Sequence, residues 1–474
     1  MAAVTRDIWN KTWKGHSVAV IGFGISNRPL TRLLRQAGAD VLVLDGKTLE
    51  QLGPSAREME AAGVRFAPYD ADGELPDGID TLFRTPGVKP GDLLIRRAVA
   101  KGVRLTSEME LFLSLTPAYT IGITGSDGKT TTTTLTGLIL EQAAARTGAR
   151  VYVGGNIGTP LLERVFEMTE KDFVVLELSS FQLMTMTQSP RRCAITNISP
   201  NHLNWHQSME EYVRAKCNIL LHPDASLFVT NACNPYTSEI AKNTDLPLIY
   251  FSAYRRDRQS MVPPFKGEAG ALYLRDGIIY YHDGKTEREI LRREDLLLPG
   301  QHNVENFMTA VGLCMGLAEK EDWEKVAKTF PGVEHRLEFV CNRAGVDYFN
   351  SSIDSSPSRT EAALKALNRR PIVLCGGQDK HVPFDSLALA LDRQASAVVL
   401  TGQARGLIQE ALVRAGAKVP VYVESEFDAA VRLAASLAKP GDTVLLSPAC
   451  TSFDVFSNFE ERGRHFKDLV RSLQ

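Results

Sequence analysis

The fold of this chain is decided by residues 119–133, which read YTIGITGSDGKTTTT. The segment starts as a β-branched apolar run, passes through a loop bounded by Gly125 and Gly128, and continues as a threonine-rich helix start. Strand, glycine loop and helix in this order are the setting of a phosphate-binding loop. Backbone N–H groups can converge on phosphate oxygens where side chains do not intervene, and the helix N-terminus that follows favours an anion. The segment therefore predicts α/β structure around a nucleotide-binding loop.

The side chains of this loop predict how it holds ATP. Lys129 supplies a mobile positive charge for the β- and γ-phosphates, and Thr130 or Thr131 supplies a hydroxyl for Mg²⁺. Ile123 occupies the position where the strict pattern G-x-x-x-x-G-K-[ST] has glycine, so only the second half of that pattern is matched. The residues predicted to bind ATP in this loop are Gly125, Ser126, Asp127, Gly128, Lys129, Thr130 and Thr131.

Upstream of the loop, residues 17–45 read as strand, helix and strand, which is a βαβ unit. The turn at residues 22–27 reads GFGISN, and Asp45 ends the second strand, about where a ribose-binding carboxylate belongs. Asn27 replaces the third glycine of the dinucleotide fingerprint. The pattern therefore favours a nucleotide or phosphate ligand other than a nicotinamide dinucleotide, and a purely structural turn is the alternative.

Downstream of the loop, two segments place polar side chains at strand ends. Residues 174–183, VVLELSSFQL, form a buried strand that delivers Glu177, and residues 196–203, TNISPNHL, end another strand with His202 beyond it. A carboxylate and a histidine at neighbouring strand ends suit a Mg²⁺ site in which carboxylate and water dominate. Taken alone, a histidine after a strand is more often a loop residue. From its own surroundings, Lys216 is predicted to be a solvated helix lysine.

The length of 474 residues exceeds what one hydrophobic core supports, and alternating strand and helix patterns divide the chain into three α/β blocks. The second block ends with a hairpin pattern at residues 276–284 and a helix at 303–316, and Pro331-Gly332 reads as a linker. The third block repeats apolar strand patterns, which predicts an open, doubly wound sheet. These patterns lie at residues 371–377, 396–400, 419–423 and 443–447.

Composition and charge narrow the classes of protein. The chain is 44% hydrophobic and 23% charged, with a net charge of −2 and no block of like charges, so nucleic acid is not an expected partner. Residues 1–16 lack the apolar core of a signal peptide, and no apolar run approaches the roughly 20 residues that span a bilayer. We therefore expect a cytoplasmic protein without membrane insertion. The seven cysteines are scattered singly without a C-x-x-C pair, which favours reduced thiols over a zinc or redox site.

Six motifs, taken in order, make the chain resemble the Mur ligase family from about Gly22 to about Phe466. These motifs are TGSDGKTT at 124–131, GGNIG at 154–158, ELSSFQ at 177–182, GQHNVEN at 300–306, EHR at 334–336 and SPACTSFD at 447–454. The resemblance implies a Rossmann-like domain over residues 1–112 that binds a uridine nucleotide. It further implies a P-loop ATPase domain with a mostly parallel sheet over 113–332, and a Rossmann-like, doubly wound domain over 333–474 that binds the amino acid.

The resemblance also implies roles for the residues that match the family's motifs. Lys129 would hold the γ-phosphate, and two Mg²⁺ ions would be held by Thr130, Glu177, His202 and Lys216, the last as a carbamylated lysine. Further ATP contacts are implied for Asn303, Asn306, Arg336, Ser351 and Asp354. Contacts with the UDP-linked substrate are implied for Gly24, Ile25, Ser26, Asp45, Gly46, Lys47, Asn156 and Gln182. Contacts with the amino acid are implied for Ser355, Lys380, Ser452, Phe453 and Phe459.

The chain departs from the family pattern in or beside this set of residues, and Asn204-Trp205 replaces a more common Asp-Arg pair. Ser351 stands where the family has a carboxylate near the adenosine ribose, and Asp354 is the candidate replacement. Asn201 replaces the aspartate that usually precedes His202.

The activity implied by the resemblance is ATP-dependent amide ligation in peptidoglycan precursor synthesis. A monomer would add D-glutamate to UDP-N-acetylmuramoyl-L-alanine through an acyl phosphate. Alternatives within reach of the same motifs are a sister ligase or folylpolyglutamate synthase with another acceptor, and a relative that adds L-glutamate. A small-molecule kinase and a nucleotide-binding regulatory protein without turnover are alternatives from other classes.

Overall fold

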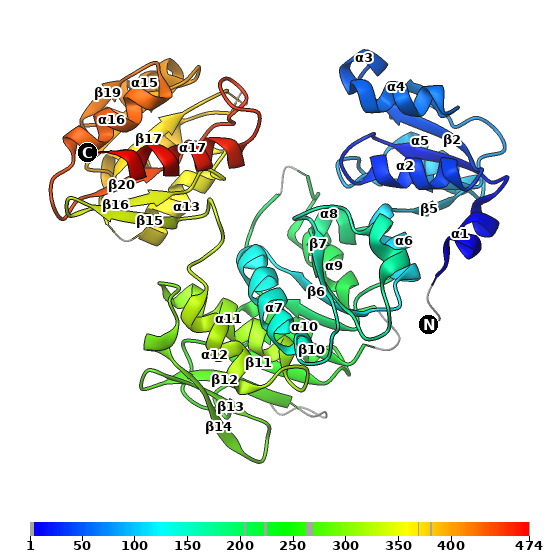
Figure 1. Cartoon of the computed structure of the whole chain (residues 1–474), viewed down its shortest axis with the longest axis horizontal. Coiled ribbons are helices and arrows are strands. Elements are labelled where there is room, and N and C mark those ends of the chain that lie inside the picture. Colours follow the sequence, from blue (N-terminus) through cyan, green and yellow to red (C-terminus); the bar gives the residue numbers. More distant parts are fainter. Residues whose placement is uncertain are drawn as a thin grey trace. The chain divides into compact units, whose positions relative to one another are not determined.

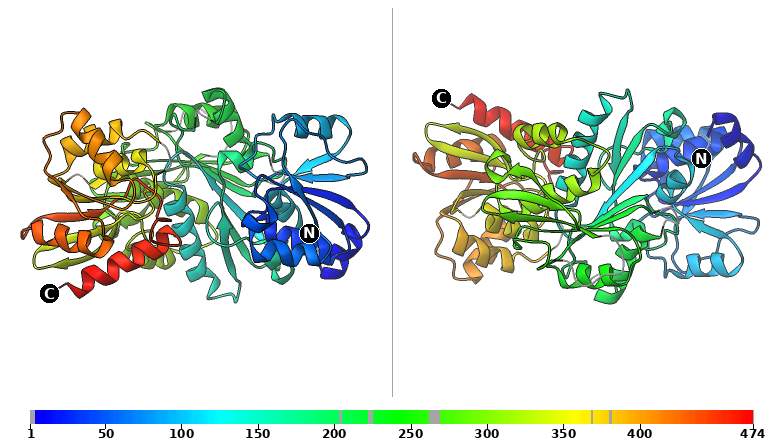
Figure 2. Two further views of the ribbon diagram at one scale, coloured as in Figure 1. Left: turned by 90° about the horizontal axis from the view of Figure 1, so that it is seen from above. Right: turned by 90° about the horizontal axis from the view of Figure 1, so that it is seen from below.

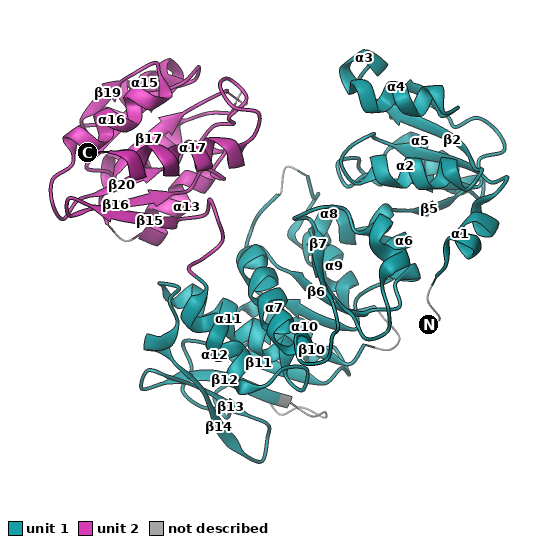
Figure 3. Cartoon of the chain, in the orientation of Figure 1, with its two compact units in different colours: residues 1–330 teal, residues 331–474 magenta. Residues whose placement is uncertain are grey.

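Strands and helices alternate along most of the described chain (Figure 1). The structure is a computed structural model that describes residues 4–202, 205–221, 225–261, 269–367, 369–379 and 382–473. It divides into two compact units, residues 1–330 and 331–474 (Figure 3). Within the described ranges, the main strands form an N-terminal sheet of five strands, a central sheet of nine and a C-terminal sheet of six. The predicted α/β class is confirmed.

The N-terminal sheet is parallel throughout and has the strand order β3-β2-β1-β4-β5. Along β1 (Ser17–Ile21), Val18 and Val20 pack into one hydrophobic core, and Ala19 and Ile21 pack into another. Because alternate side chains of a strand point to opposite faces, both faces of this sheet are covered by helices, as Figure 2 shows. The Rossmann-like prediction is therefore confirmed. The other strands are β2 (Asp40–Asp45), β3 (Arg65–Pro68), β4 (Thr81–Phe83) and β5 (Arg104–Thr106), and the helices are α1 (Arg6–Trp13), α2 (Asn27–Gln36), α3 (Leu49–Leu52), α4 (Pro54–Ala61) and α5 (Leu93–Ala100).

The first helix, α1, is an element that the sequence analysis did not predict. Its N-terminus is capped by Thr5, and its buried residues are Trp9 and Trp13. The indole N–H of Trp9 donates to the backbone oxygen of Leu33 at 3.1 Å. Trp9 therefore ties the start of the chain to α2, and the Trp13 ring packs near Phe83, with centroids 5.7 Å apart.

The central sheet places the phosphate-loop strand in its interior. Its order is β14-β13-β12-β11-β10-β9-β6-β8-β7, parallel except for the hairpins at one edge. Ile123 pairs with Glu177 on one side, and Thr124 pairs with Ile195 on the other. The strands are β6 (Tyr119–Thr124), β7 (Val151–Gly155), β8 (Phe173–Glu177), β9 (Arg192–Ile195), β10 (Leu227–Asn231), β11 (Leu248–Ser252), β12 (Ala269–Arg275), β13 (Ile278–His282) and β14 (Glu287–Arg292). The predicted mostly parallel sheet and the predicted hairpins are both confirmed, and the parallel pairing brings three distant motifs to one edge.

Helices flank this sheet, and two of them meet beside the loop. Helix α7 follows β6 through the loop, and α11 packs against α7 (Figures 1 and 2). The helices of this part are α6 (Glu108–Leu115), α7 (Lys129–Ala144), α8 (Ser180–Leu183), α9 (Met209–Cys217), α10 (Pro235–Lys242), α11 (Gln301–Cys314) and α12 (Lys320–Thr329).

The first unit contains both the N-terminal and the central sheets because one hydrophobic core runs through both. That core joins Val18 and Val20 of β1 to Val174 and Leu176 of β8. The domain limit expected between residues 112 and 113 falls inside helix α6. The division into three domains stays a prediction, because the chain divides into only two compact units, between residues 330 and 331.

The C-terminal sheet has the order β15-β16-β20-β17-β18-β19, with only β15 antiparallel to its neighbour. Along β17 (Ile372–Gly376), Val373 and Cys375 enter one core, and Ile372 and Leu374 enter the other. The predicted doubly wound sheet is therefore confirmed. The other strands are β15 (Glu338–Arg343), β16 (Val346–Asn350), β18 (Ala397–Thr401), β19 (Val421–Val423) and β20 (Thr443–Leu446), and the helices are α13 (Pro357–Leu367), α14 (Asp385–Gln394), α15 (Arg405–Arg414), α16 (Phe427–Leu437) and α17 (Phe459–Ser472).

Within the described ranges, no helix combines the length and the apolar character that crossing a membrane requires. The seven cysteines are free thiols, and Cys193, Cys314, Cys375 and Cys450 are buried.

A buried carboxyl group at the start of α6 makes the stability of the first unit depend on pH. Glu108 is 5% exposed, and its Oε1 has no hydrogen-bond partner among the described residues. Burial raises the pKa of Glu108 to about 8. The folded chain thus keeps this proton at neutral pH, whereas the unfolded chain releases it above a pKa of roughly 4.3. The protonated group therefore makes its full favourable contribution to the free energy of unfolding below the pKa of the unfolded chain. This contribution is lost as the pH rises toward 8.

We expect the substitution Glu108→Gln to stabilise the fold at pH 8 relative to the native chain. The advantage should shrink toward pH 5 by about 1.4 kcal/mol per pH unit, because glutamine carries no proton to lose. Urea unfolding followed by circular dichroism across this range measures the difference. Glu141→Gln, at an exposed position of α7, is the matched control. An advantage of Glu108→Gln that does not vary with pH would contradict the assignment.

Candidate active site

The phosphate loop has the geometry of an anion site. Gly125 and Gly128 adopt φ values of 147° and 78°, in the region that glycine favours. No described side chain caps α7, which begins at Lys129, so the positive end of the helix dipole lies at the loop. The Lys129 ammonium donates to the backbone oxygens of Gly125 and Ser126, each at 3.1 Å. The positive charge therefore lies over the loop that should receive the phosphates.

Residues that follow β9 support this loop from one side. The Thr196 hydroxyl donates to the Asp127 oxygen at 2.6 Å, and the Asn197 side-chain oxygen accepts from the Asp127 N–H at 3.0 Å. The hydroxyls of Ser126 and Tyr212 are 2.9 Å apart. A Cβ atom at Gly125 would overlap the Thr196 hydroxyl, which explains why this position needs glycine.

Helix α11 supports the loop from the other side. The Asn306 amide donates to Asn303 Oδ1 at 3.0 Å, and the Thr132 hydroxyl donates to Asn306 Oδ1 at 3.4 Å. Asn303 in turn donates to the Pro299 oxygen at 2.7 Å. Two residues that the family resemblance assigned to ATP, Asn303 and Asn306, therefore lie together beside α7, and their contact with ATP stays a prediction.

We expect Gly128→Ala to lower both ATP turnover and stability. Its φ of 78° costs an alanine about 1–2 kcal/mol, and the new methyl group would overlap Asn306 Oδ1. A loss of turnover greater than about tenfold should result, because the loop must move to relieve the overlap. Gly148→Ala is the matched control, since Gly148 has a φ of 71° with open space around it. The control should cost stability without loss of turnover, and equal turnover in both variants would contradict this account.

Glu177 presents a buried carboxylate at the end of β8. Its side chain is 2% exposed, and Oε1 accepts from the Asn156 amide at 2.9 Å. The other oxygen, Oε2, is buried without a hydrogen-bond partner among the described residues. A buried carboxylate oxygen without a partner is costly, and a divalent cation is the ligand that such an oxygen suits. Thr130 lies at the start of α7, and its role and that of Glu177 as ligands of Mg²⁺ stay predictions.

Lys216 is buried, so its prediction as a solvated helix lysine is wrong. It lies on α9 with 1% exposure, and its Nζ donates to the Gly125 oxygen at 2.8 Å and the Thr124 hydroxyl at 3.3 Å. Burial, and then the nearby charge of Lys129, lower the pKa of Lys216 well below its usual value. Residue type indicated an exposed lysine, and the burial comes from β6 and the loop, which are far away in sequence.

His202 is exposed and adopts a φ of 56°. Its ring lies edge-on to Phe181, with centroids 5.0 Å apart. Residues 203 and 204, which follow it, lie outside the described ranges. Its role as a metal ligand stays a prediction.

His206 is a buried residue that the sequence analysis missed. Its ring stacks on Phe181, with centroids 5.6 Å apart, and its Nε2 lies 2.9 Å from the Ser180 hydroxyl. Burial lowers the pKa of His206, which favours the neutral ring. This contact anchors α8. In the sequence, the only sign of a role for His206 was its position four residues after His202.

The glycine turn of the N-terminal sheet is held by Asp45 and Asn27. Asp45 accepts from the N–H groups of Phe23 at 2.7 Å and Lys47 at 2.9 Å. The Asn27 amide donates to the oxygens of Ile21 and Gly22, each at 3.0 Å, so Asn27 replaces the missing third glycine with a side-chain tie. The ligand contacts predicted in this turn and for Asp45 stay predictions. The exposed positions of this group are Gly24, Ile25, Gly46 and Lys47, and Ser26 is partly buried.

Arg84 is a second residue that the motifs did not reveal. It follows β4 with 1% exposure, and it donates to the Val88 oxygen at 2.7 Å and the Phe181 oxygen at 2.7 Å. Burial lowers its pKa to about 10. It thus links the loop after β4 to α8, where Gln182 closes a capping box with Ser179.

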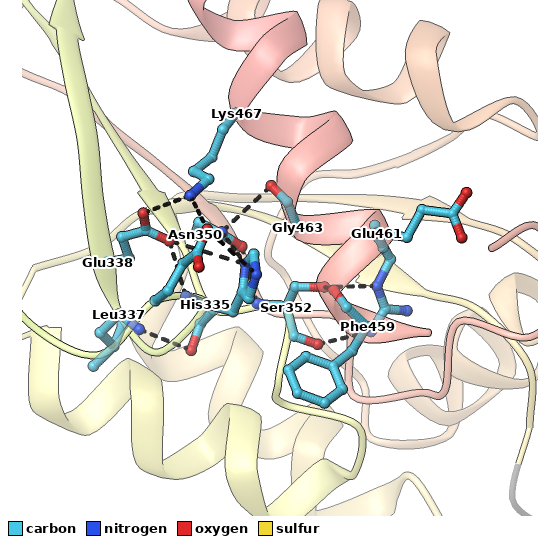
Figure 4. Close-up of polar contacts among 12 residues, drawn as sticks. His335, Leu337, Glu338, Asn350, Ser352, Phe459, Glu461, Gly463 and Lys467 are labelled. Atoms are coloured by element: carbon cyan, nitrogen blue, oxygen red, sulfur yellow. Dashed lines mark hydrogen bonds and ion pairs between the residues drawn. The ribbon is translucent and has the colours of Figure 1, made fainter. Parts of the chain in front are cut away.

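In the second unit, Arg336 lies in a constrained segment between His335 and Leu337, both of which Figure 4 labels. Its neighbours His335 and Leu337 have φ values of 63° and 44°, which are unusual for residues with side chains. Lys467 of α17 donates to Glu334 at 2.5 Å and to Glu338 at 2.9 Å, and Figure 4 labels Lys467 and Glu338. The contacts hold the segment in place against α17.

The polar side chains around this segment form hydrogen bonds with one another. His335 Nδ1 lies 2.9 Å from the Asn350 amide, which also donates to Glu338 at 3.0 Å (Figure 4). Glu334, His335 and Glu338 are close enough together to bind a cation. The Lys467 ammonium already contacts both carboxylates, so we assign no metal ion to this group.

Ser351 and Asp354 both lie inside the second unit. The Ser351 hydroxyl accepts from the Leu337 N–H at 3.1 Å, and Asp354 accepts from the Ser447 hydroxyl at 2.8 Å. Burial raises the pKa of Asp354 to about 6. Their predicted contacts with ATP, like that of Arg336, stay predictions.

The residues predicted to bind the amino acid lie on several segments of the second unit. Ser452 is buried, Phe453 is 64% exposed, and Ser355 and Phe459 are half-buried. The Ser352 hydroxyl donates to the Phe459 oxygen at 2.8 Å, which joins two of these segments (Figure 4). Lys380 lies outside the described residues.

Comparisons with known proteins agree with this arrangement. Residues 123–314 match the Mur ligase middle domain, and residues 335–450 match the Mur ligase glutamate ligase domain. The UDP-N-acetylmuramoylalanine–D-glutamate ligase of Acetivibrio thermocellus is 40% identical, with 98% of each chain covered. The ligase of the same name from Clostridium novyi is 42% identical, with 97% of each chain covered.

Solved structures show the same fold. The UDP-N-acetylmuramate-alanine ligase of Thermotoga maritima has a TM-score of 0.55 at 20% identity, over 96% of this chain and 99% of that one. MurF of Acinetobacter baumannii has a TM-score of 0.56 at 15% identity, over 98% of this chain and 92% of that one.

Proposed function

The chain belongs to the Mur ligase family, and we propose that it joins D-glutamate to UDP-N-acetylmuramoyl-L-alanine, with conversion of ATP to ADP and phosphate, in peptidoglycan precursor synthesis. One observation carries the proposal: Lys129, Glu177 and Lys216 gather around the phosphate loop at one edge of the central sheet. The relatives that match nearly the whole chain bear the name of this ligase. An amide-forming ligase accounts for the loop and for the buried carboxylate and lysine beside it.

Amide formation in water needs a carboxylate oxygen that can leave. A carboxylate oxygen of the L-alanyl group attacks the γ-phosphorus of ATP, ADP leaves, and an acyl phosphate forms. The amine of D-glutamate then attacks the acyl carbon and loses a proton, and inorganic phosphate leaves. The protein forms no covalent bond, so its contribution is position and charge, with Lys129 beside the transferred group.

Magnesium is the cofactor that the donors of the site suit. We assign Thr130 and Glu177 to one ion, and His202 and Lys216 to a second. When bound, the ions would offset the negative charge that gathers as carboxylate and phosphate approach each other. Glu177 Oε2, which is buried without a hydrogen-bond partner within the described ranges, supports the first assignment.

Lys216 would suit a cation only as a carbamate. Burial lowers its pKa, and the neutral amine is the form that attacks carbon dioxide. An N–C bond forms, one proton passes to solvent, and the product carries a negative charge. That charge would sit beside Gly125 and Lys129, where an ammonium group is disfavoured.

The substrates are assigned to separate parts of the chain. The turn at residues 22–27, with Asp45, Asn156 and Gln182, is proposed to bind the UDP-linked substrate. The second unit is proposed to bind D-glutamate. We place the enzyme in the cytoplasm, where ATP is made, as a monomer.

Release of inorganic phosphate by the purified chain tests the function. The assay contains ATP, Mg²⁺ and UDP-N-acetylmuramoyl-L-alanine, and it compares D-glutamate, L-glutamate and other amino acids. Release that depends on D-glutamate supports the proposal. Release with another amino acid would identify a sister ligase, transfer of phosphate without its release a kinase, and absence of turnover a regulatory protein.

A further inference from the structure

We propose that Arg462 is a positioning residue for the amino-acid site: it holds together the segments that bind D-glutamate and places a buried positive charge beside them. The inference rests on the proposed function and adds to it a residue that lies outside the family motifs quoted above.

Arg462 lies on α17 with 2% exposure, and its guanidinium uses every nitrogen. Nε donates to the Ser352 hydroxyl at 3.0 Å, and Nη2 donates to the Ser352 oxygen at 2.8 Å. Nη1 donates to the Thr451 oxygen at 3.1 Å, and both terminal nitrogens donate to the Cys450 oxygen at 3.3 Å. One planar group therefore spans two segments that are about a hundred residues apart in sequence.

These segments carry the residues assigned to D-glutamate. Ser352 lies three residues before Ser355, and Cys450 and Thr451 come directly before Ser452. The same Ser352 hydroxyl donates to the Phe459 oxygen at 2.8 Å (Figure 4). Arg462 thus acts, directly or through Ser352, on three of the assigned segments.

A fourth segment is joined to the same arrangement. The Gln378 N–H donates to the Thr451 oxygen at 2.9 Å, and the Thr451 N–H donates to the Gln378 oxygen at 3.2 Å. A Cβ atom at Gly377 would overlap that Thr451 oxygen, so the two backbones lie in close contact. Arg462 is thus linked, through Thr451, to the segment that follows β17.

No carboxylate among the described residues forms a hydrogen bond with Arg462, while Asp454 and Asp354 are near enough to favour its charged form. All its hydrogen-bond partners among the described residues are carbonyl or hydroxyl oxygens. Burial lowers the pKa of Arg462 to about 10, and the group still keeps its proton at neutral pH. In a medium of low dielectric, a positive charge without a contacting carboxylate favours an anionic ligand nearby. Glutamate, with two carboxylates and one ammonium, is such a ligand.

A purely structural role for Arg462 would affect all three substrates alike, whereas a positioning role affects one. We expect Arg462→Gln in the full chain to raise the KM for D-glutamate by about 10-fold to 100-fold. The KM values for ATP and for UDP-N-acetylmuramoyl-L-alanine should stay within about twofold of native. Arg462→Lys keeps the charge and loses the planar guanidinium group, so its KM for D-glutamate should lie between those of the native chain and of Arg462→Gln.

Two further variants keep the test decisive. Arg464→Gln, two residues along α17 at an exposed position, should leave all three KM values unchanged. Ser352→Ala removes one acceptor and one donor of the arrangement and should raise the KM for D-glutamate by a smaller factor, even where Arg462→Gln does not fold.

Each outcome decides between the inference and the function on which it rests. Unchanged KM values for D-glutamate in Arg462→Lys and Ser352→Ala, or equal changes for all three substrates, would overturn the inference. A native chain that releases no phosphate with D-glutamate would overturn the proposed function instead.

Discussion

Lys129→Ala is expected to reduce ATP-dependent phosphate release by about 10³-fold or more. Lys129 supplies the positive charge over the loop, where its ammonium donates to the backbone oxygens of Gly125 and Ser126. The γ-phosphate gathers further negative charge as the substrate carboxylate approaches, so this charge matters most in the transition state. Removing it should lower kcat rather than only raise the KM for ATP.

The fold should survive Lys129→Ala, because alanine is well suited to the first turn of α7. Thermal unfolding checks this point, with Lys242→Ala at an exposed position of α10 as the control for loss of a lysine. Lys129 also lowers the pKa of Lys216, so the substitution should raise that pKa. Turnover within tenfold of native by a folded Lys129→Ala variant would refute the assignment of this loop to ATP.

Glu177→Gln should reduce phosphate release by about 10²-fold or more, with weaker dependence on Mg²⁺. Glutamine has nearly the same shape as glutamate. Its side-chain oxygen can still accept the hydrogen bond that the Asn156 amide donates to Glu177 Oε1 at 2.9 Å. The substitution therefore removes the charge of Oε2, which has no hydrogen-bond partner among the residues described, while it keeps the packing. A loss of cation affinity is the direct consequence.

Binding of Mg²⁺ measured by calorimetry separates this effect from a loss of chemistry alone. We expect the apparent dissociation constant for Mg²⁺ to rise about 10-fold to 100-fold in Glu177→Gln, and high Mg²⁺ to restore part of the turnover. Glu141→Gln, at an exposed position of α7, serves as the control. Native affinity for Mg²⁺ in Glu177→Gln would remove Glu177 from the metal site.

Much of the fold could be predicted from local patterns. The apolar runs near residues 17–22, 41–45, 119–124 and 371–377 are strands, because β-branched runs bounded by turn residues rarely form anything else. Helix α1 was missed because its buried tryptophans are separated by polar residues, so only their contacts with the rest of the unit define the element.

Residues outside motifs could not be predicted. Arg84, His206 and Arg462 are buried polar residues without a distinctive neighbourhood in the sequence. Each of them forms a hydrogen bond with a residue at least 26 positions away in the sequence. His206, for example, contacts Ser180. A local pattern contains no information about such partners.

The sequence by itself determined that this chain has a phosphate loop between a strand and a helix, within α/β structure, because glycine spacing and apolar periodicity are local properties. Only the tertiary structure decided that Lys216 is buried against Gly125 and that one oxygen of Glu177 has no hydrogen-bond partner in the part of the chain that the structure describes. Burial and charge depend on what distant segments place around a side chain. Parallel pairing of β6 with β8 and β9 brings those segments together, and no stretch of sequence contains that pairing alone.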